Sequence, residues 1–406
     1  MLHRIIYIVI LGGALIGLTL QIPESSSLPN PHQAEAKALF EKVPYSKYRN
    51  RLEHLVRLID RIEEIEARNT LFFELCRMTR YFLDIPGFHT RSFLERQTTL
   101  LTQATRSALY LEKTFQNKMD GKRVFSVGPY GYIKERPLPL HEVICSDLSV
   151  LFDCMDYIAP TCETFFNGKP MVYQPRIEAK VHNHLFQFSK RFSSRSKQID
   201  LLVFWKFNLF MVLLGHSDLV PFNIPITKRK IPVSWDNEYT FLTNLHVKAE
   251  KKRPQFLYQL PFVNVLLDYP QAYHKLSKGE LSRVKRIMQK WKALQNNITL
   301  YMEHPYTKHR LTSLQSHVLQ DRLTLLTDEA LLKDDPILRN YIKHQFPDIF
   351  CGTEEACLLV EKILHEPVTP MSATYFIYGC RNWPAFMKGE DQEVFNKWIE
   401  KNHLKH

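Results

Sequence analysis

Residues 46–83, SKYRNRLEHLVRLIDRIEEIEARNTLFFELCRMTRYFL, give the clearest indication of the fold class. Leu52, Leu55 and Ile59 recur at steps of three and four residues, with charged residues between them. Apolar residues at this spacing lie on one face of an α-helix. We therefore predict a single helix from about residue 46 to residue 83, ending before Pro86.

A second amphipathic helix is predicted to follow the Pro-Gly dipeptide. Ser92 and Glu95 have the S-x-x-E spacing of a helix-capping box. Leu100 and Leu111 continue on one apolar stripe. Because two helices joined by a short turn pack antiparallel, we predict an antiparallel helix hairpin within residues 34–118.

The rest of the body, residues 119–406, is predicted to be mixed but mainly helical. Glycine is scarce, with 13 in 406 residues, although Rossmann-type sheets and β-hairpins draw on glycine at their turns. The 23 prolines divide the chain into short elements. Two short strands are expected at 124–127 and 130–133. The predicted fold class is therefore mainly α with minor β, in an irregular helical domain.

The N-terminal residues 5–20, IIYIVILGGALIGLTL, contain no charged residue. As a helix this stretch would span about 24 Å, slightly short for a membrane span and slightly long for the apolar part of a signal peptide. No small-x-small cleavage pair follows Leu20 directly. We therefore predict a signal-anchor at residues 1–22 and a spacer at 23–33, with a cleaved signal peptide as the alternative.

The few charges beside this stretch predict the orientation of the chain. Arg4 and the α-amino group precede the apolar residues, and positive charge favours the cytoplasmic side. We expect a single-pass membrane protein with a cytoplasmic N-terminus and an extracytoplasmic body. If the segment is cleaved, the protein would instead be secreted or periplasmic.

The net charge of +12 comes from the middle of the chain. Residues 176–310 contain 23 Lys and Arg against 9 Asp and Glu. A concentration of positive charge indicates an anionic partner such as an acidic lipid surface or an acidic protein. Nucleic acid is the less expected partner, and a basic surface that only aids solubility is the other interpretation.

Residues 277–294 carry the strongest binding feature of the body. Ser277 and Glu280 form a second capping-box pattern, and the helix that follows has an apolar face opposite a basic face. A helix packed on the core with a solvated basic face is the alternative. The residues predicted to bind an anionic surface are Lys278, Arg283, Lys285, Arg286, Lys290, Trp291 and Lys292.

Sequence motifs for catalysis are missing, so enzymatic activity stays open. The chain lacks a G-x-S-x-G elbow, an H-E-x-x-H pair, a phosphate loop and a C-x-x-C motif. A single H-x-H pair, His182 and His184, is too little to predict a metal site, and no cofactor is expected. The 14 residues 201–214 are apolar enough for a buried helix or, alternatively, an interfacial one.

Two functional hypotheses follow from these observations. The first is an exported, membrane-anchored helical protein that binds a partner or a membrane surface without catalysis. The second is a single-pass anchored enzyme of glycosyl transfer or hydrolysis, with a lumenal or periplasmic catalytic domain. Its catalytic residues are not predicted, but a sugar nucleotide or metal bound in a cleft near His216, Asp218, Asp236 or Glu238 would favour this hypothesis.

Overall fold

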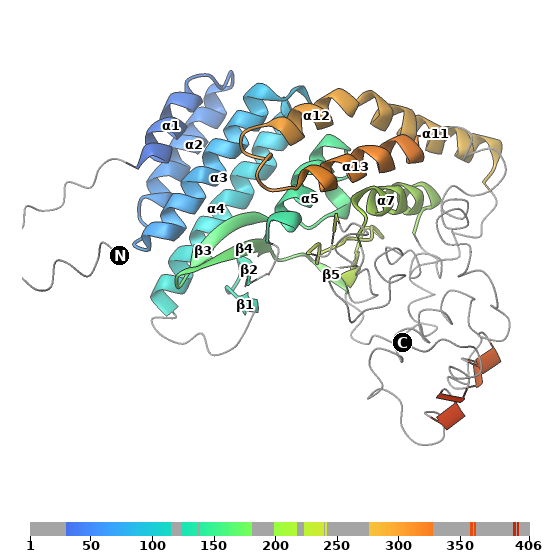
Figure 1. The fold of residues 1–406 in the computed structure, drawn as a ribbon. Helices are drawn as coiled ribbons and strands as arrows, with labels where there is room; N and C mark the ends of the chain where they lie inside the picture. The colour runs from blue at the N-terminus through green and yellow to red at the C-terminus, as the bar shows by residue number, and fades with distance from the viewer. Residues whose placement is uncertain are drawn as a thin grey trace, which may run out of the picture.

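A computed structural model describes most of the body of the chain. The described residues are 30–114, 124–135, 139–180, 199–216, 223–238, 240–241 and 276–327, with short pieces at 358–359, 361–362, 393–394 and 396–397. This part is mainly helical with a small antiparallel sheet, which confirms the predicted fold class (Figure 1). Residues 1–22, His182, His184 and Asp218 lie outside the described residues. Among the described helices, none has the length and apolarity needed to cross a membrane.

Four helices pack together at the N-terminal end of the body (Figure 1). They are α1 (Pro31–Phe40), α2 (Ser46–Ile59), α3 (Ile65–Asp84) and α4 (Arg91–Thr114). Helix α1 begins within the predicted spacer, because the Asn30 side chain accepts a hydrogen bond from the His32 backbone N–H and Pro31 occupies the first position.

The prediction of one helix over residues 46–83 is wrong at its centre, where residues 60–64 separate α2 from α3. Ile62 is buried in this break. The backbone N–H of Glu64 donates to Glu112 Oε1 on α4 over 3.0 Å, which satisfies a donor that the start of α3 would leave free. The break therefore depends on a contact with a helix 48 residues away.

Helices α3 and α4 pack against each other across the short 3-10 helix η2 (Pro86–Phe88). The expected capping box at Ser92 is not the cap of α4. Thr90 Oγ1 accepts the backbone N–H of Phe93 instead, and the helix begins at Arg91. The cap lies two residues earlier than its sequence pattern indicates.

The main sheet has the strand order β1-β2-β4-β3, with every pair antiparallel. Its strands are β1 (Val124–Ser126), β2 (Gly131–Lys134), β3 (Cys162–Phe166) and β4 (Lys169–Pro175), so both expected strands are present. Asn167 and Gly168 join β3 to β4 with φ of 51° and 73°, as a type I′ turn requires. Residues 171–174 of β4 are all buried, so both faces of this strand are covered.

Helix α5 (Pro139–Leu151) packs against β3 and β4, and α7 (Leu201–Leu214) lies farther from the four N-terminal helices (Figure 1). The Asp200 carboxylate accepts the N–H groups of Leu202 and Val203, and Gly215 ends α7 in the left-handed conformation. Residues 207–214 of α7 are all buried. Helix α7 is therefore a core helix, and the interfacial alternative is wrong.

Three further helices follow in the described part of the chain, α11 (Lys278–Ala293), α12 (Gln295–Glu303) and α13 (Ser313–Leu326). Two of them, α11 and α13, pack against α7 (Figure 1). The capping box at the start of α11 is formed as predicted, because Ser277 Oγ accepts the Glu280 N–H and Glu280 Oε2 accepts the Ser277 N–H. A short 3-10 helix η3 (Met155–Tyr157) and the two-stranded sheet of β5 (Ala179–Lys180) and β6 (Ile226–Thr227) complete the fold.

Candidate functional site

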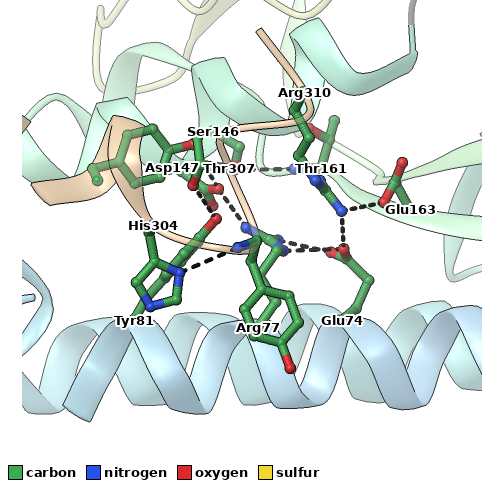
Figure 2. A network of polar contacts seen from close by, with 12 residues as sticks. Glu74, Arg77, Tyr81, Ser146, Asp147, Thr161, Glu163, His304, Thr307 and Arg310 are labelled. Carbon is green, nitrogen blue, oxygen red and sulfur yellow. Dashed lines mark hydrogen bonds and ion pairs between the residues drawn. The ribbon is translucent and has the colours of Figure 1, made fainter. Parts of the chain in front are cut away.

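The largest group of buried charges lies on the inner face of α3 (Figure 2). Glu74, Arg77 and Tyr81 are spaced by three and four residues, so they point to one side of the helix. Arg77 makes a two-pronged ion pair with Glu74, with Nε–Oε1 at 3.0 Å and Nη2–Oε2 at 2.7 Å. Its third nitrogen, Nη1, contacts Asp147 Oδ2 on α5.

Segments far apart in the sequence complete this ion network (Figure 2). Arg310, in the loop after α12, donates through Nη2 to Glu74 Oε1 at 3.2 Å and to Glu163 Oε2 on β3. Tyr301 donates to Asp147 Oδ2 over 3.0 Å. The network therefore joins α3, α5, β3 and the segment around α12.

The network holds three carboxylates and two guanidinium groups, which leaves one excess negative charge if every group is ionised. Burial raises the pKa of Glu163 to about 7, although Arg310 opposes the shift. Burial also acts to raise the pKa of Glu74, but the charges of Arg77 and Arg310 outweigh it and the pKa of Glu74 is lowered. Burial likewise raises the pKa of Asp147, although Arg77 opposes the shift. Glu163 and Asp147 therefore both favour the protonated form that would relieve the excess charge, and Glu163 is the more exposed of the two.

This arrangement links α3 to α5, β3 and the loop after α12, and it engages Arg77 completely. The charged groups of Arg77 are all committed to Glu74 and Asp147, and both partners are buried. A buried guanidinium group whose nitrogens are all paired has no charged donor left to bind a substrate. Its chemical consequence is instead a stability that depends on pH, since Glu163 titrates near neutrality.

Of the residues near which a bound ligand would favour an enzyme, His216, just after α7, and Asp236, after β6, lie close together. His216 Nε2 lies 3.0 Å from Ser234 Oγ, and the Asp236 carboxylate acts electrostatically on the same ring. Burial lowers the pKa of His216 to about 4, although Asp236 opposes the shift. His216 is therefore neutral near pH 7. The backbone carbonyl of Glu238 lies 3.1 Å from Nδ1 of a different histidine, His141.

The direction of the hydrogen bonds argues against a nucleophilic serine at this place. Ser234 Oγ donates to Asn237 Oδ1 over 2.6 Å, and Asn237 Nδ2 donates back to the Ser234 carbonyl over 3.2 Å. A hydroxyl has only one proton, so Ser234 Oγ accepts from His216 Nε2. An activated serine would donate its proton to the histidine. The three side chains instead close a buried turn.

The predicted anionic-surface residues divide between the core and the surface. Trp291 is buried, its Nε1 donates to the Phe152 carbonyl over 3.2 Å, and its ring packs edge-on against Phe152 at 5.2 Å. Trp291 is thus a core residue and cannot contact a partner. The charged residues are exposed except for the half-buried Lys285: Lys278, Arg283, Arg286, Lys290 and Lys292.

The basic side chains of α11 form two stripes on its outer side. Arg283, Arg286 and Lys290 are spaced by three and four residues, which places them on one stripe. The second stripe contains Lys278, Lys285 and Lys292 at steps of seven. Between them on the inner side lie the buried residues of α11, Val284, Met288 and Trp291. The core contacts of α11 therefore orient both basic stripes outward.

Sequence reasoning missed the ion network entirely. Glu74 and Arg77 resemble an ordinary exposed ion pair of an amphipathic helix, because their i,i+3 spacing is common on exposed faces. The available signal was that Glu74 and Arg77 lie among the apolar residues of α3 instead of opposite them.

Comparison with protein-family models, curated proteins and solved structures finds no match to this chain.

Proposed function

We propose that the protein is a membrane-anchored, non-catalytic protein whose helix α11 binds an anionic phospholipid surface. The observation that carries the proposal is the division of α11 into a buried apolar side and an outer side with five exposed basic residues and the half-buried Lys285. Glu280 is the one acid in this helix, and its carboxylate is engaged in the capping box. The exposed side is therefore strongly positive.

The burial of Trp291 changes how this binding would work. An amphipathic helix that inserts into a membrane uses its apolar face, but the apolar face of α11 packs on α7. Binding must then be electrostatic, at about 1 kcal/mol for each Lys or Arg close to the lipid surface. It should be strongly weakened by salt, because the Debye length falls to about 8 Å at physiological ionic strength.

The N-terminal residues 1–22 belong to the same proposal as a signal-anchor. A single-pass anchor with a cytoplasmic N-terminus would place the extracytoplasmic body close to a membrane at all times. Tethering raises the effective concentration of α11 at the lipid surface, so weak electrostatic contacts suffice. If residues 1–22 are cleaved, the secreted or periplasmic body would have to bind by α11 alone.

The experiment compares vesicles of phosphatidylcholine with vesicles that also contain phosphatidylglycerol. Insertion of the anchor is common to both, so the difference in co-sedimentation of the full chain reports the electrostatic contribution. We expect the variant R283E/R286E/K290E to lose at least about 10-fold of the preference for the anionic vesicles, because three lipid contacts become repulsive. Salt should abolish the preference of the wild type.

A matched charge reversal elsewhere on the body distinguishes binding through α11 from a general effect of the net charge of the protein. Lys47, Arg57 and Arg61 are exposed basic residues at the other end of the body, in or next to α2. The variant K47E/R57E/R61E carries the same change in net charge as the α11 variant. We expect it to retain most of the preference for anionic vesicles. Equal losses in the two variants would contradict the assignment to α11.

The enzymatic alternative, glycosyl transfer or hydrolysis, has one observation in its favour. His216 and Asp236 come close together although they are 20 residues apart in the sequence. The test is thermal stabilisation by a nucleoside diphosphate sugar with Mn²⁺, lost in the variant D236N. Unchanged melting of the wild type would remove the support for glycosyl transfer.

A further inference from the structure

Helices α1 and α3 bring three different metal-ligating groups together at their contact. His32 and Glu35 lie one turn apart near the start of α1, and Cys76 lies on α3. One donor atom from each side chain lies within 4.8 Å of the others. The three atoms are an imidazole nitrogen, a carboxylate oxygen and a sulfur, which are the donors found in zinc sites.

One ring nitrogen of His32 is buried without a hydrogen-bond partner. Nδ1 is buried and makes no hydrogen bond, and it lies 3.6 Å from Glu35 Oε2. A buried polar atom without a hydrogen-bond partner destabilises the folded state, so its presence calls for an explanation. A metal ion between Nδ1 and the carboxylate would satisfy it. The ring itself is partly exposed, which leaves a path for an ion and a water.

The carboxylate of Glu35 is held in an orientation that suits a ligand. Its Oε1 accepts a hydrogen bond from the Tyr306 hydroxyl over 2.9 Å and lies 3.5 Å from Arg80 Nε. Oε2 is thereby turned toward His32. Hydrogen-bond and ion-pair partners that orient a metal-binding side chain in this way are typical of metal sites.

The other two ligands are also positioned by the surrounding structure. The His32 ring packs edge-on against Phe73 with centroids 5.5 Å apart, and its backbone N–H is held by Asn30. Cys76 is buried, and its Sγ donates to the His32 carbonyl over 3.2 Å. The thiol is therefore already in contact with the residue that would share the metal.

We propose that His32 Nδ1, Glu35 Oε2 and Cys76 Sγ bind Zn²⁺, with water in the fourth position. The soft sulfur disfavours Mg²⁺ and Ca²⁺, which take oxygen ligands, whereas Zn²⁺ accepts all three donor types. Three protein ligands with one open position resemble catalytic zinc centres more than closed four-ligand structural sites. The ion would also link α1 directly to α3.

Binding replaces a proton on sulfur by the metal. Burial raises the pKa of the Cys76 thiol to about 12, and the Glu35 charge acts in the same direction. The metal-free thiol is therefore neutral near pH 7. When Zn²⁺ binds, the S–H bond breaks, a Zn–S bond forms from the sulfur electron pair, and one proton goes to solvent. Affinity should consequently rise with pH.

The test uses Co²⁺ as a spectroscopic probe on the full chain purified without metal. A thiolate ligand gives an intense sulfur-to-cobalt charge-transfer band in the near ultraviolet. We expect this band to saturate at one Co²⁺ per chain and to disappear on addition of Zn²⁺. Removing the Tyr306 hydroxyl in Y306F should weaken binding by about 10-fold, since it orients the carboxylate.

Cysteine variants decide which thiol is involved. The variant C76S should lose the band, and H32Q should weaken Co²⁺ binding while keeping the fold, since its ring is partly exposed. The controls C154S, which changes another buried thiol, and C351S/C357S/C380S should keep the band. Absence of the band in the wild type, unchanged affinity in H32Q, or a band that survives in C76S would overturn the proposal.

Discussion

Arg77 on α3 contacts Asp147 on α5 through Nη1 while its other two nitrogens hold Glu74, so one guanidinium group joins two carboxylates that are 73 residues apart. All three side chains are buried. Removing one partner of a buried ion pair leaves the other charge desolvated and unpaired. The stability of the body should therefore depend strongly on this single side chain.

The variant R77M tests this dependence. We expect the free energy of unfolding to fall by about 3–5 kcal/mol, because Asp147 and part of the Glu74 charge lose their partner. Urea unfolding followed by circular dichroism measures the change. The control R57M alters an exposed arginine of α2 and should stay within about 0.5 kcal/mol of the wild type.

The double variant R77M/D147N refines the same test. R77M leaves the Asp147 charge without its arginine partner, whereas D147N leaves Arg77 paired with Glu74 alone. The double change removes both the charge of Asp147 and its partner. Its cost should be smaller than the sum of the two single costs. Simple additivity of R77M and D147N would show that the two side chains do not interact energetically.

Glu163 should make stability fall as pH rises toward neutrality. Its folded-state pKa is raised to about 7 from a model-compound value of 4.5, so the folded state binds more protons at this group between these values. The stabilising contribution is complete below the unfolded pKa and is lost as pH rises through the folded pKa. Urea unfolding at several values between about pH 5 and 8 measures this slope.

The variant E163Q should remove that slope, because glutamine cannot ionise. Glu53 lies exposed on α2 and provides the control variant E53Q, which should retain the wild-type dependence on pH. The opposite trend at low pH comes from Glu74, whose lowered pKa makes stability fall as the group protonates. A slope in E163Q equal to that of the wild type would contradict the role of Glu163.

Two glycines should respond to alanine with opposite signs. Gly215 ends α7 with φ of 57°, and an added Cβ would clash with the Arg322 guanidinium. We expect G215A to destabilise the protein by more than about 1 kcal/mol. Gly279 is in the first turn of α11 with open space around its Cβ position, and G279A should stabilise by up to about 1 kcal/mol. Thermal melting distinguishes the two.

Trp291 should matter for stability and leave lipid binding unchanged. Its ring is buried between Phe152 and Phe210, so W291A should cost about 3–5 kcal/mol. The milder W291F preserves most of the packing and allows a binding measurement on folded protein. We expect its preference for anionic vesicles to equal that of the wild type. A loss comparable to the charge reversal of α11 would indicate that the ring contacts lipid.

Local sequence patterns predicted the elements whose boundaries depend on local contacts. The capping box of α11 formed as expected, because Ser277 and Glu280 satisfy each other's backbone groups without help from elsewhere. The apolar run of α7 also predicted a buried helix correctly, because composition and length are local properties of the sequence. The cap of α4 was misplaced, since both Thr90 and Ser92 have a hydroxyl and only the fold selects between them.

The basic residues of α11 lie on its outer side as their spacing predicts, whereas Trp291, which was predicted to bind with them, is buried. The spacing of the basic residues follows from helical periodicity and can be read directly. The burial of Trp291 depends on α7 and Phe152, which lies 139 residues earlier in the chain. Periodicity shows which residues share a face, but not whether that face meets another helix or solvent.

By itself, the sequence determined the mainly helical class, the two short strands and the basic character of α11, because these follow from periodicity, turn residues and charge. The tertiary structure alone decided the break between α2 and α3, the ion network around Arg77, and the meeting of His32 and Glu35 with Cys76. Each of these depends on side chains that are distant in sequence and adjacent only after packing. The energy of a buried charge or a metal ligand depends on its neighbours in space, and local patterns carry no information about them.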